Sequence, residues 1–497
     1  MTDRTEMDRP KFRVITGGRR RGGAVAPCLM LPPPPDMGPS ELAAEIAELY
    51  ALALIRDVPF AALKDPHHAV WVDGSTRFTL HELLCEMRSL AWYDTRGGIL
   101  SAQTVSDAAL QRRAQRLNGE GQLTLNGLFR GVVPGQAAKG PLSLYHWIDR
   151  SAPEQREIAG AAPDAEAPMS AWVEWVARQS GAVLAMPTAT ADDLSPLATP
   201  RQLVARLQDS HPCRIHYNAA LMLLARGTAF DPGLGAGLWP EGEDDPVTAQ
   251  RVLALMTEAA DRAFEAVMRR QARADRLSPP AVTAARLGGL LARSELRAEG
   301  GEQLREVADE LQTYAPNLLH WITRLNRQSP NGLRGAMRYL LPDMSPDEIP
   351  PQPSDCALQV VVAGALSTLF KALFDTRPAP RLRMATDPEP GVDIGAEADR
   401  LAADIALSRT LSGAQLPAET HQNLRIGEAL ALQVLQGWML TLGHGVSMDL
   451  VDFDGGALRL ESHPRHAGDM AVALRRDGRP VRFPMVAERA SVHLAVI

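Results

Sequence analysis

The sequence has few of the features that assign a protein to a class at once. Its four cysteines are spread over 497 residues, without zinc-ligand spacing, which argues against a disulfide framework or a metal site. No apolar run approaches the roughly 18 residues that a membrane-spanning helix needs. The net charge of −7 is mild for this length, so the electrostatic footprint of a nucleic-acid-binding protein is absent. We therefore expect a cytoplasmic protein without a metal site, a membrane span or a nucleic-acid partner.

The chain is rich in apolar residues, at 45%, and their spacing changes along it. Residues 1–35 are basic, Gly-rich and Pro-ended, with no apolar periodicity, which predicts a disordered tail. An export signal around Arg19–Arg21 is not expected, because the segment after it is short and Gly-rich. From Ser40, apolar residues recur at helical spacing, with Ser40 as the expected N-cap. Further helical patterns predict a helical domain over residues 36–445.

The last part of the chain has a different pattern. Val446–Glu461 alternates around Asp454-Gly455-Gly456, and Val472–Phe483 alternates around Asp477-Gly478. Alternation on both sides of an Asp-Gly turn is typical of a β-hairpin. About fifty residues of hairpin seldom make an independent core. The prediction is a mainly α protein, a helical bundle with a small C-terminal β-hairpin appendage (446–497) packed on it.

The stretch Pro350–Ala365 is the most informative part of the sequence. It follows a loop rich in Pro and Asp and opens an apolar helix predicted at Leu358–Phe374. The first N–H groups of a helix are unpaired and the helix dipole is positive there, so such a junction suits an anion.

This junction resembles one in the bacterial vanadium-dependent haloperoxidases, relatives of the type 2 acid phosphatases. Their motif H-P-[ST]-Y-P-[AS]-G-H-A precedes an apolar helix ending in K-A-[FL]-F-D. Here Pro353, Ser354 and Ala357 are retained, and Lys371–Asp375 reads K-A-L-F-D. Motifs in the same order continue the resemblance over about Pro39–Glu461. It implies a haloperoxidase-like helical bundle.

Two of those motifs carry charged site residues in the family. Arg270–Pro279 (R-Q-A-R-A-D-R-L-S-P) resembles a lysine followed eight places later by Arg-Pro. We expect positions 270 and 278 to face the same way, because eight residues are a little over two helical turns. Arg409–Glu419 matches R-x-x-x-G-V-H-x-x-x-D without a gap.

In the resembled family, a vanadate ion is bonded to one histidine and its oxygens are held by a lysine, two arginines, a small residue and a glycine N–H. A second histidine acts as acid or base. The resemblance implies that the altered catalytic positions here are Gln352, Gln359, Gln415 and Glu419, with Gln415 in the place of the vanadate-bonding histidine. It places the anion-binding positions at Arg270, Ser278, Ala357, Leu358 and Arg409.

The substitutions bear directly on the chemistry. Glutamine has no basic nitrogen, so it can neither bond vanadium nor move a proton near neutral pH. We therefore assign no catalytic residue and expect no cofactor. The first hypothesis is a haloperoxidase-like pseudoenzyme, a non-catalytic binding or interaction protein in a homo- or hetero-oligomer. The alternatives are an enzyme that reuses the cavity for vanadate-independent chemistry or a small anionic ligand, and a residual haloperoxidase.

Structural interpretations of the same residues stay open. The three glutamines can form a hydrogen-bonded polar plug, and Arg270 and Arg409 can pair with Glu419 or Asp355. His421 could replace the lost histidine, but its register predicts a wet surface position.

Overall fold

One helix, α14 (Pro353–Leu373), forms the centre of the computed structural model of this chain. Every residue from Gln359 to Phe374 is buried, including Ser367, Thr368 and Lys371. A helix that is apolar all round has no face suited to water and belongs in a core. The predicted apolar helix is thus confirmed as the central element.

The structure describes residues 30–95, 105–128, 143, 199–208, 211–225, 227–235, 247–273, 275, 277–292, 301–328, 335–342, 353–376, 393–465 and 470–484. Most of the predicted N-terminal tail lies outside these residues. So does Gln352, one of the candidate site residues.

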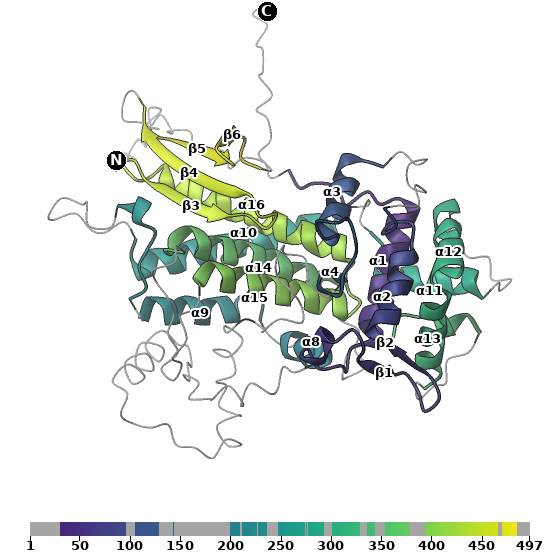
Figure 1. The fold of residues 1–497 in the computed structure, drawn as a ribbon. Helices are drawn as coiled ribbons and strands as arrows, with labels where there is room; N and C mark the ends of the chain where they lie inside the picture. Colours follow the sequence, from purple (N-terminus) through teal and green to yellow (C-terminus); the bar gives the residue numbers. More distant parts are fainter. Residues whose placement is uncertain are drawn as a thin grey trace, which may run out of the picture.

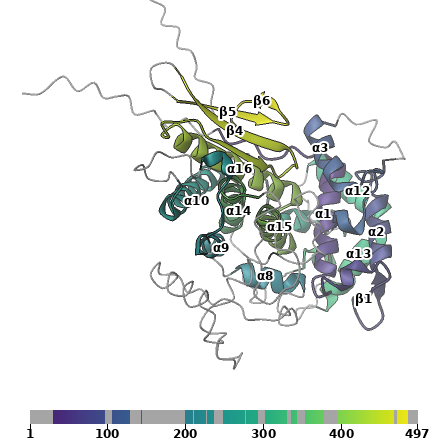
Figure 2. The ribbon, with the colours of Figure 1, turned by 60° about the vertical axis from the view of Figure 1, so that its left-hand side comes forward.

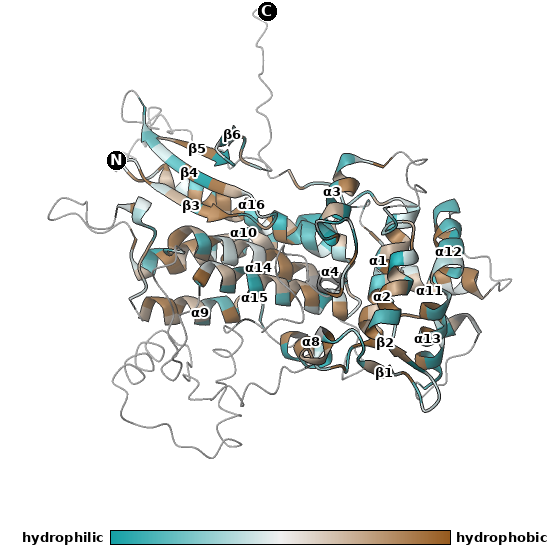
Figure 3. Cartoon of the chain, viewed as in Figure 1, coloured by the Kyte–Doolittle hydropathy of each residue, from teal (hydrophilic) through white to brown (hydrophobic). Residues whose placement is uncertain are grey.

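Three long helices surround α14: α10 (Ala249–Gln271), α15 (Ile394–Leu411) and α16 (Pro417–Met439). Figure 1 shows them stacked side by side, with α9 (Arg214–Ala225) along their lower edge. In Figure 3, α14 and α9 are mostly brown, which marks the apolar residues that this bundle buries.

Two glycines allow α14 and α16 to pack closely. A Cβ on Gly364 of α14 would meet the backbone of Leu424, and a Cβ on Gly427 of α16 would meet the backbone of Val361 and Ala365. Neither position has room for a side chain. The two glycines therefore allow the backbones of α14 and α16 to come into direct contact where the helices cross.

A second group of helices lies beside this bundle, at the right of Figure 1 and separated from it again in the turned view of Figure 2. It contains α1 (Pro39–Leu54), α2 (Leu80–Ser89), α11 (Pro280–Leu291), α12 (Glu302–Tyr314) and α13 (Pro316–Arg327). Helix α1 joins the two groups, because it packs on α12 and α13 and also reaches α15. Its N-cap is Gly38 and Pro39 opens it, so the expected N-cap Ser40 is already inside the helix.

Short elements complete the helical part. The hairpin of β1 (Ala69–Trp71) and β2 (Arg77–Thr79) leads into α2, which Thr79 and Glu82 start with a capping box. Within the described residues, the other helices are α3 (Asp107–Arg116), α4 (Leu125–Leu128) and α8 (Pro200–Gln208), with 3-10 turns at Ala62–Lys64, Pro232–Leu234 and Gly335–Tyr339.

The C-terminal strands form one antiparallel sheet in the order β3 (Ser447–Val451), β4 (Ala457–Pro464), β5 (Met470–Arg476) and β6 (Arg479–Val481). The two predicted hairpin turns are present, with Gly455 at φ 84° and Gly478 at φ 77°. Pairing of β4 with β5 joins the hairpins into four strands. The sheet is attached to the bundle at Phe453, whose ring lies 4.1 Å from Lys371 Nζ and whose N–H donates to Glu428.

Candidate functional site

Arg409 lies in the last turn of α15 and is only 3% exposed. Its Nη2 donates to the carbonyl oxygen of Leu207 at 2.8 Å. Leu207 is in the last turn of α8, where carbonyl groups have no partner within the helix. A cation is favoured there by the negative end of the helix dipole. Arg409 therefore holds the end of α8 against α15.

Gln359 reaches the same acceptor from α14. It is buried, and its Nε2 donates to Leu207 O at 3.2 Å. A carbonyl oxygen has two lone pairs and can accept both bonds. The structure thus brings together two of the predicted site residues, and their shared contact is a backbone group.

Gln415 lies between α15 and α16 and is 3% exposed. The chain reaches it through Gly413, whose φ of 69° ends α15 in the left-handed conformation that glycine adopts freely. The side-chain oxygen Oε1 accepts no hydrogen bond within the described part of the chain. A buried amide oxygen of this kind leaves one hydrogen-bonding position open for a donor.

Arg270 lies in the last turn of α10, and its side chain contacts the first turns of α16. Its Nη1 donates to Asn423 Oδ1 and its Nη2 to Gln422 Oε1, both at 2.6 Å. Burial lowers the pKa of Arg270, although a guanidinium stays protonated in proteins. Burial also raises the pKa of Glu419, against the opposing effect of Arg270. Arg270 and Glu419 therefore interact through their charges. The hydrogen bonds of Arg270 go to the side-chain oxygens of Asn423 and Gln422 instead.

The other predicted positions do not join this cluster. Helix α10 ends at Gln271, and Ser278 lies on an exposed segment beyond it, so the shared helix face expected for positions 270 and 278 is not formed. Ala357 and Leu358 are half-buried in the first turns of α14. Gln352 and the side chains of Asp355 and Cys356 lie outside what the structure describes.

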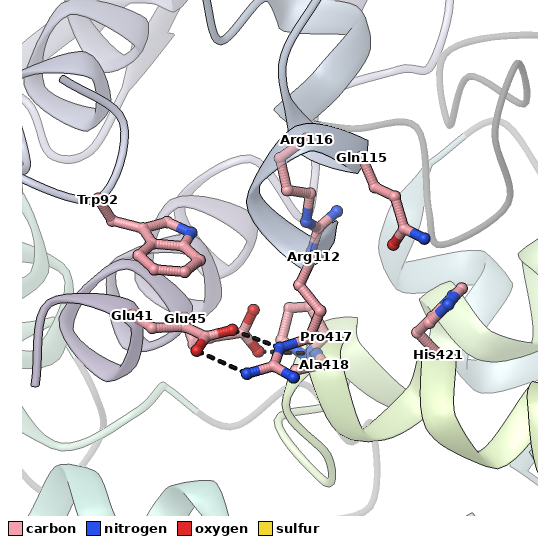
Figure 4. A pocket seen from close by; sticks show the side chains of 9 residues that line it. All are labelled: Glu41, Glu45, Trp92, Arg112, Gln115, Arg116, Pro417, Ala418 and His421. Carbon is pink, nitrogen blue, oxygen red and sulfur yellow. Dashed lines mark hydrogen bonds and ion pairs between the residues drawn. The ribbon is translucent and has the colours of Figure 1, made fainter. Parts of the chain in front are cut away.

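A second polar cluster lies between α1, α3 and the start of α16, and sequence reasoning missed it. Its small cavity, about 20 Å³, is lined by Glu41, Glu45, Trp92, Arg112, Gln115, Arg116, Pro417, Ala418 and His421 (Figure 4). That volume holds a water molecule rather than an organic substrate. The available signal was the helical spacing of Glu41, Glu45 and Glu48, matched by that of Arg112 and Arg116.

The charges in this cluster are paired across helices. Arg112 Nε lies 2.6 Å from Glu41, and Arg116 Nη2 lies 3.0 Å from Glu48. Glu45 accepts from the N–H of Ala418 at 2.8 Å. Burial raises the pKa of Glu45 to about 8, despite the nearby Arg116. Glu45 is therefore largely protonated at neutral pH.

His421 does not occupy the wet surface position that its register predicted. Its side chain is 15% exposed, and its Nε2 lies 3.0 Å from Asp454 Oδ1. Gln115 donates to the same oxygen at 3.0 Å. His421 thus joins α16 to the turn before β4 and to α3, on a different side of α16 from Arg270.

Within the described residues, no group of three or more His, Cys, Asp or Glu side chains is placed to hold a metal ion. Likewise, no helix among them is both long and apolar enough to cross a membrane.

The fold is that of a vanadate-dependent bromoperoxidase. The homohexameric structure of the second such enzyme from Ascophyllum nodosum superimposes with a TM-score of 0.59, at 17% identity, over 92% of this chain and 75% of that one. The predicted helical, haloperoxidase-like fold is confirmed.

Sequence comparison agrees, although no family model matches the chain. It is 26% identical over 497 residues to the vanadium-dependent bromoperoxidase of Corallina pilulifera, covering 88% of this chain and 77% of the relative. The Corallina officinalis enzyme gives the same values, and that of Ascophyllum nodosum is 24% identical over 455 residues. The chain is therefore similar in sequence to vanadium-dependent bromoperoxidases over most of its length. The narrower relation to the bacterial enzymes stays a prediction.

The comparisons contradict the expectation that no cofactor is involved, since all three relatives are named as vanadium-dependent. The residues at the predicted positions nevertheless do not fit a histidine-bonded vanadate. Gln359 and Gln415 offer amides in place of imidazoles, and the hydrogen bonds of Arg270 go to Asn423 and Gln422. No reaction step is therefore derived through vanadate at these positions.

Proposed function

We propose that this chain is a haloperoxidase-like protein that has lost halide turnover and acts as a non-catalytic binding or interaction subunit. The observation that carries the proposal is the shared contact of Gln359 and Arg409 with Leu207 O. Two side chains at positions that face the oxyanion in the resembled family here hold the end of a helix. Their role in this chain is to support the fold.

The chemistry of the substituted positions supports the same proposal. An acid–base group commonly contributes about 10² to 10⁴ in rate, and the amide of Gln359 or Gln415 cannot act as a general acid or base near neutral pH. The buried Arg409 and the partly buried Arg270 are the cations at these positions. The proposal concerns turnover, and vanadate binding is measured separately.

An oligomeric state is part of the proposal. The structural neighbour from Ascophyllum nodosum is a homohexamer, and a non-catalytic subunit acts through its partners. We propose a homo-oligomer, with a hetero-oligomer containing another protein as the alternative. A cytoplasmic location is proposed from the scarcity of cysteine.

A second candidate function is a vanadium-dependent haloperoxidase with different site residues. The observation that favours it is the 26% identity to a bromoperoxidase over 88% of this chain. In that case a nitrogen ligand other than those at positions 359 and 415 would have to bond the vanadate.

One sample distinguishes the two candidates. Vanadate and phosphate binding are measured by calorimetry on the purified full chain, and bromide oxidation by peroxide is assayed on the same protein with and without vanadate. We expect no turnover above the vanadate-free reaction. Vanadate binding without turnover agrees with a non-catalytic subunit that keeps the cofactor. Vanadate-dependent turnover would overturn the proposal and establish the second candidate.

A further inference from the structure

The outward face of α10 carries an unusual combination of side chains. Phe264 is 54% exposed and Met268 is 49% exposed, one helical turn apart. Beside them runs a row of alternating charges, defined here as the α10 charge row: Glu258, Arg262, Glu265 and Arg269. Phe264 and Met268 together form a small exposed apolar patch, and an apolar patch bordered by polar residues is a feature of contact surfaces.

The pairs within the row are simple surface ion pairs. Arg262 lies 2.6 Å from Glu258, and Arg269 lies 2.6 Å from Glu265, each with i,i+4 spacing. Exposed pairs of this kind contribute only about 0.3–0.5 kcal/mol in helices. The four charges are therefore free to rearrange toward a second surface at little cost.

The order of the charges makes the row complementary to itself. Read forward it is negative, positive, negative, positive, and read backward it is the reverse, with the same spacing in both directions. When two copies of a helix pack antiparallel about a two-fold axis, the same flank of each helix meets its mate. Glu258 then opposes Arg269 of the second copy, and Arg262 opposes Glu265.

The apolar side chains fit the same arrangement. The midpoint of the charge row lies next to Phe264 in the sequence. In the antiparallel pairing the two Phe264 rings therefore approach each other near the axis, flanked by Met268. Aromatic and Met side chains are enriched at the centres of interfaces, with charged residues toward the rim.

We propose that α10 is an interface between two copies of this chain, packed antiparallel across a two-fold axis. The choice of a second copy rests on the homo-oligomer of the proposed function, while the location rests on the charge row and the exposed Phe264 and Met268. One helix pair buries less than the roughly 1,200 Å² typical of a stable interface. The contact is therefore weak alone and acts as one of the interfaces in a larger assembly.

One charged residue, Asp261, is unfavourable for the proposed interface and gives a further test of it. Asp261 is exposed on the same face, and no arginine opposes it in this register. Replacing it by Asn removes a repulsion between the two copies. Asp261→Asn is expected to strengthen association.

The test measures the mass distribution of the full chain by sedimentation velocity over a range of concentrations. The double variants Glu258→Arg/Glu265→Arg and Arg262→Glu/Arg269→Glu each place like charges opposite each other. We expect each to dissociate at concentrations at least tenfold higher than wild type does. An equimolar mixture of the two regains association, because each helix then opposes its complement. The matched control is Glu302→Arg/Glu306→Arg, the same charge change on the exposed side of α12.

The outcomes separate this inference from the function proposed above. If the wild-type chain is oligomeric and the α10 variants keep its mass, the interface is wrong while the oligomer stands. If the wild-type chain is monomeric at all concentrations, both the proposed homo-oligomer and the α10 interface are wrong. Phe264→Asp tests the centre of the contact independently, and unchanged association of that variant also contradicts the interface. Circular dichroism of each variant confirms that the helical fold is kept.

Discussion

Gln359 and Arg409 are linked through a single oxygen atom, since both donate to the carbonyl of Leu207, at 3.2 Å and 2.8 Å. The bonds tie α14 and α15 to the last turn of α8. Because the three groups are buried, water cannot replace a lost bond without cost. The resemblance places this junction where the family binds an oxyanion, and it provides the most direct tests of the proposed structural role.

Arg409→Leu is expected to lower the free energy of unfolding by about 3 kcal/mol. The change removes a buried charged donor and leaves Leu207 O with a weaker set of partners, and hydrogen bonds made by charged groups contribute about 1.5–3 kcal/mol. Urea unfolding followed by circular dichroism measures the change. Arg327→Leu, at an exposed position of α13, is the control and should shift stability by less than about 0.5 kcal/mol. Equal effects of the two variants would contradict the role of Arg409.

Gly427→Ala and Gly437→Ala, both on α16, should have opposite effects. A Cβ at position 427 collides with the backbone of Val361 and Ala365, whereas a Cβ at 437 meets nothing within 4 Å. Overpacking costs about 1–3 kcal/mol or more when backbone must move, so Gly427→Ala is destabilised. Gly437→Ala gains about 0.5–1 kcal/mol from helix propensity and reduced chain entropy. Thermal melting of the two variants checks this, and a stable Gly427→Ala protein would exclude the close crossing of α14 and α16.

Stability should fall with rising pH because of Glu45. Its folded pKa of about 8 lies above the ordinary glutamate value of 4.5, so the folded state holds a proton that the unfolded state releases. The contribution of Glu45 is complete below pH 4.5 and is lost as the pH rises to about 8. Glu45→Gln keeps a neutral side chain at every pH. The stability of this variant relative to wild type is therefore expected to increase from pH 5 to pH 8.

Glu461→Gln provides the comparison for that pH series. Arg459 lowers the pKa of the half-buried Glu461, so any contribution of this carboxylate is lost only as the pH falls below 4.5. Between pH 5 and pH 8 the free energy of unfolding of Glu461→Gln should therefore change with pH as that of wild type does. If the free energy of unfolding of Glu45→Gln also changes with pH as that of wild type does, Glu45 is ionised in the folded protein at neutral pH. The burial argument then fails.

Gln415→His restores an imidazole at the position that bonds vanadate in the resembled family. The buried Oε1 of Gln415 has an open hydrogen-bonding position among the described residues, so the site accepts a change of polar group. We expect vanadate affinity to rise at least about tenfold, equivalent to about 1.4 kcal/mol, in calorimetric titrations. Gln433→His, a buried glutamine further along α16, is the matched control and should leave affinity unchanged. An unaltered affinity in Gln415→His would show that position 415 does not face an oxyanion site.

Local sequence patterns determined much of the fold. The apolar run of α14 predicted a core helix, the Asp-Gly turns predicted both C-terminal hairpins, and spaced motifs indicated the haloperoxidase-like bundle. The helix and the hairpins depend on residues close in the chain, where helical and strand periodicity act directly. The haloperoxidase-like bundle was implied by the resemblance of the motifs to that family.

Tertiary structure decided the contacts of the candidate site. Leu207 lies 152 residues from Gln359 and 202 from Arg409, and no local periodicity encodes which distant carbonyl a buried donor reaches. The same holds for Glu45, whose raised pKa follows from burial beneath α3 and α16. Sequence alone thus placed the helices and identified the substituted positions. Only packing decided that their side chains hold helices together, because hydrogen bonding and desolvation depend on neighbours that the fold brings close.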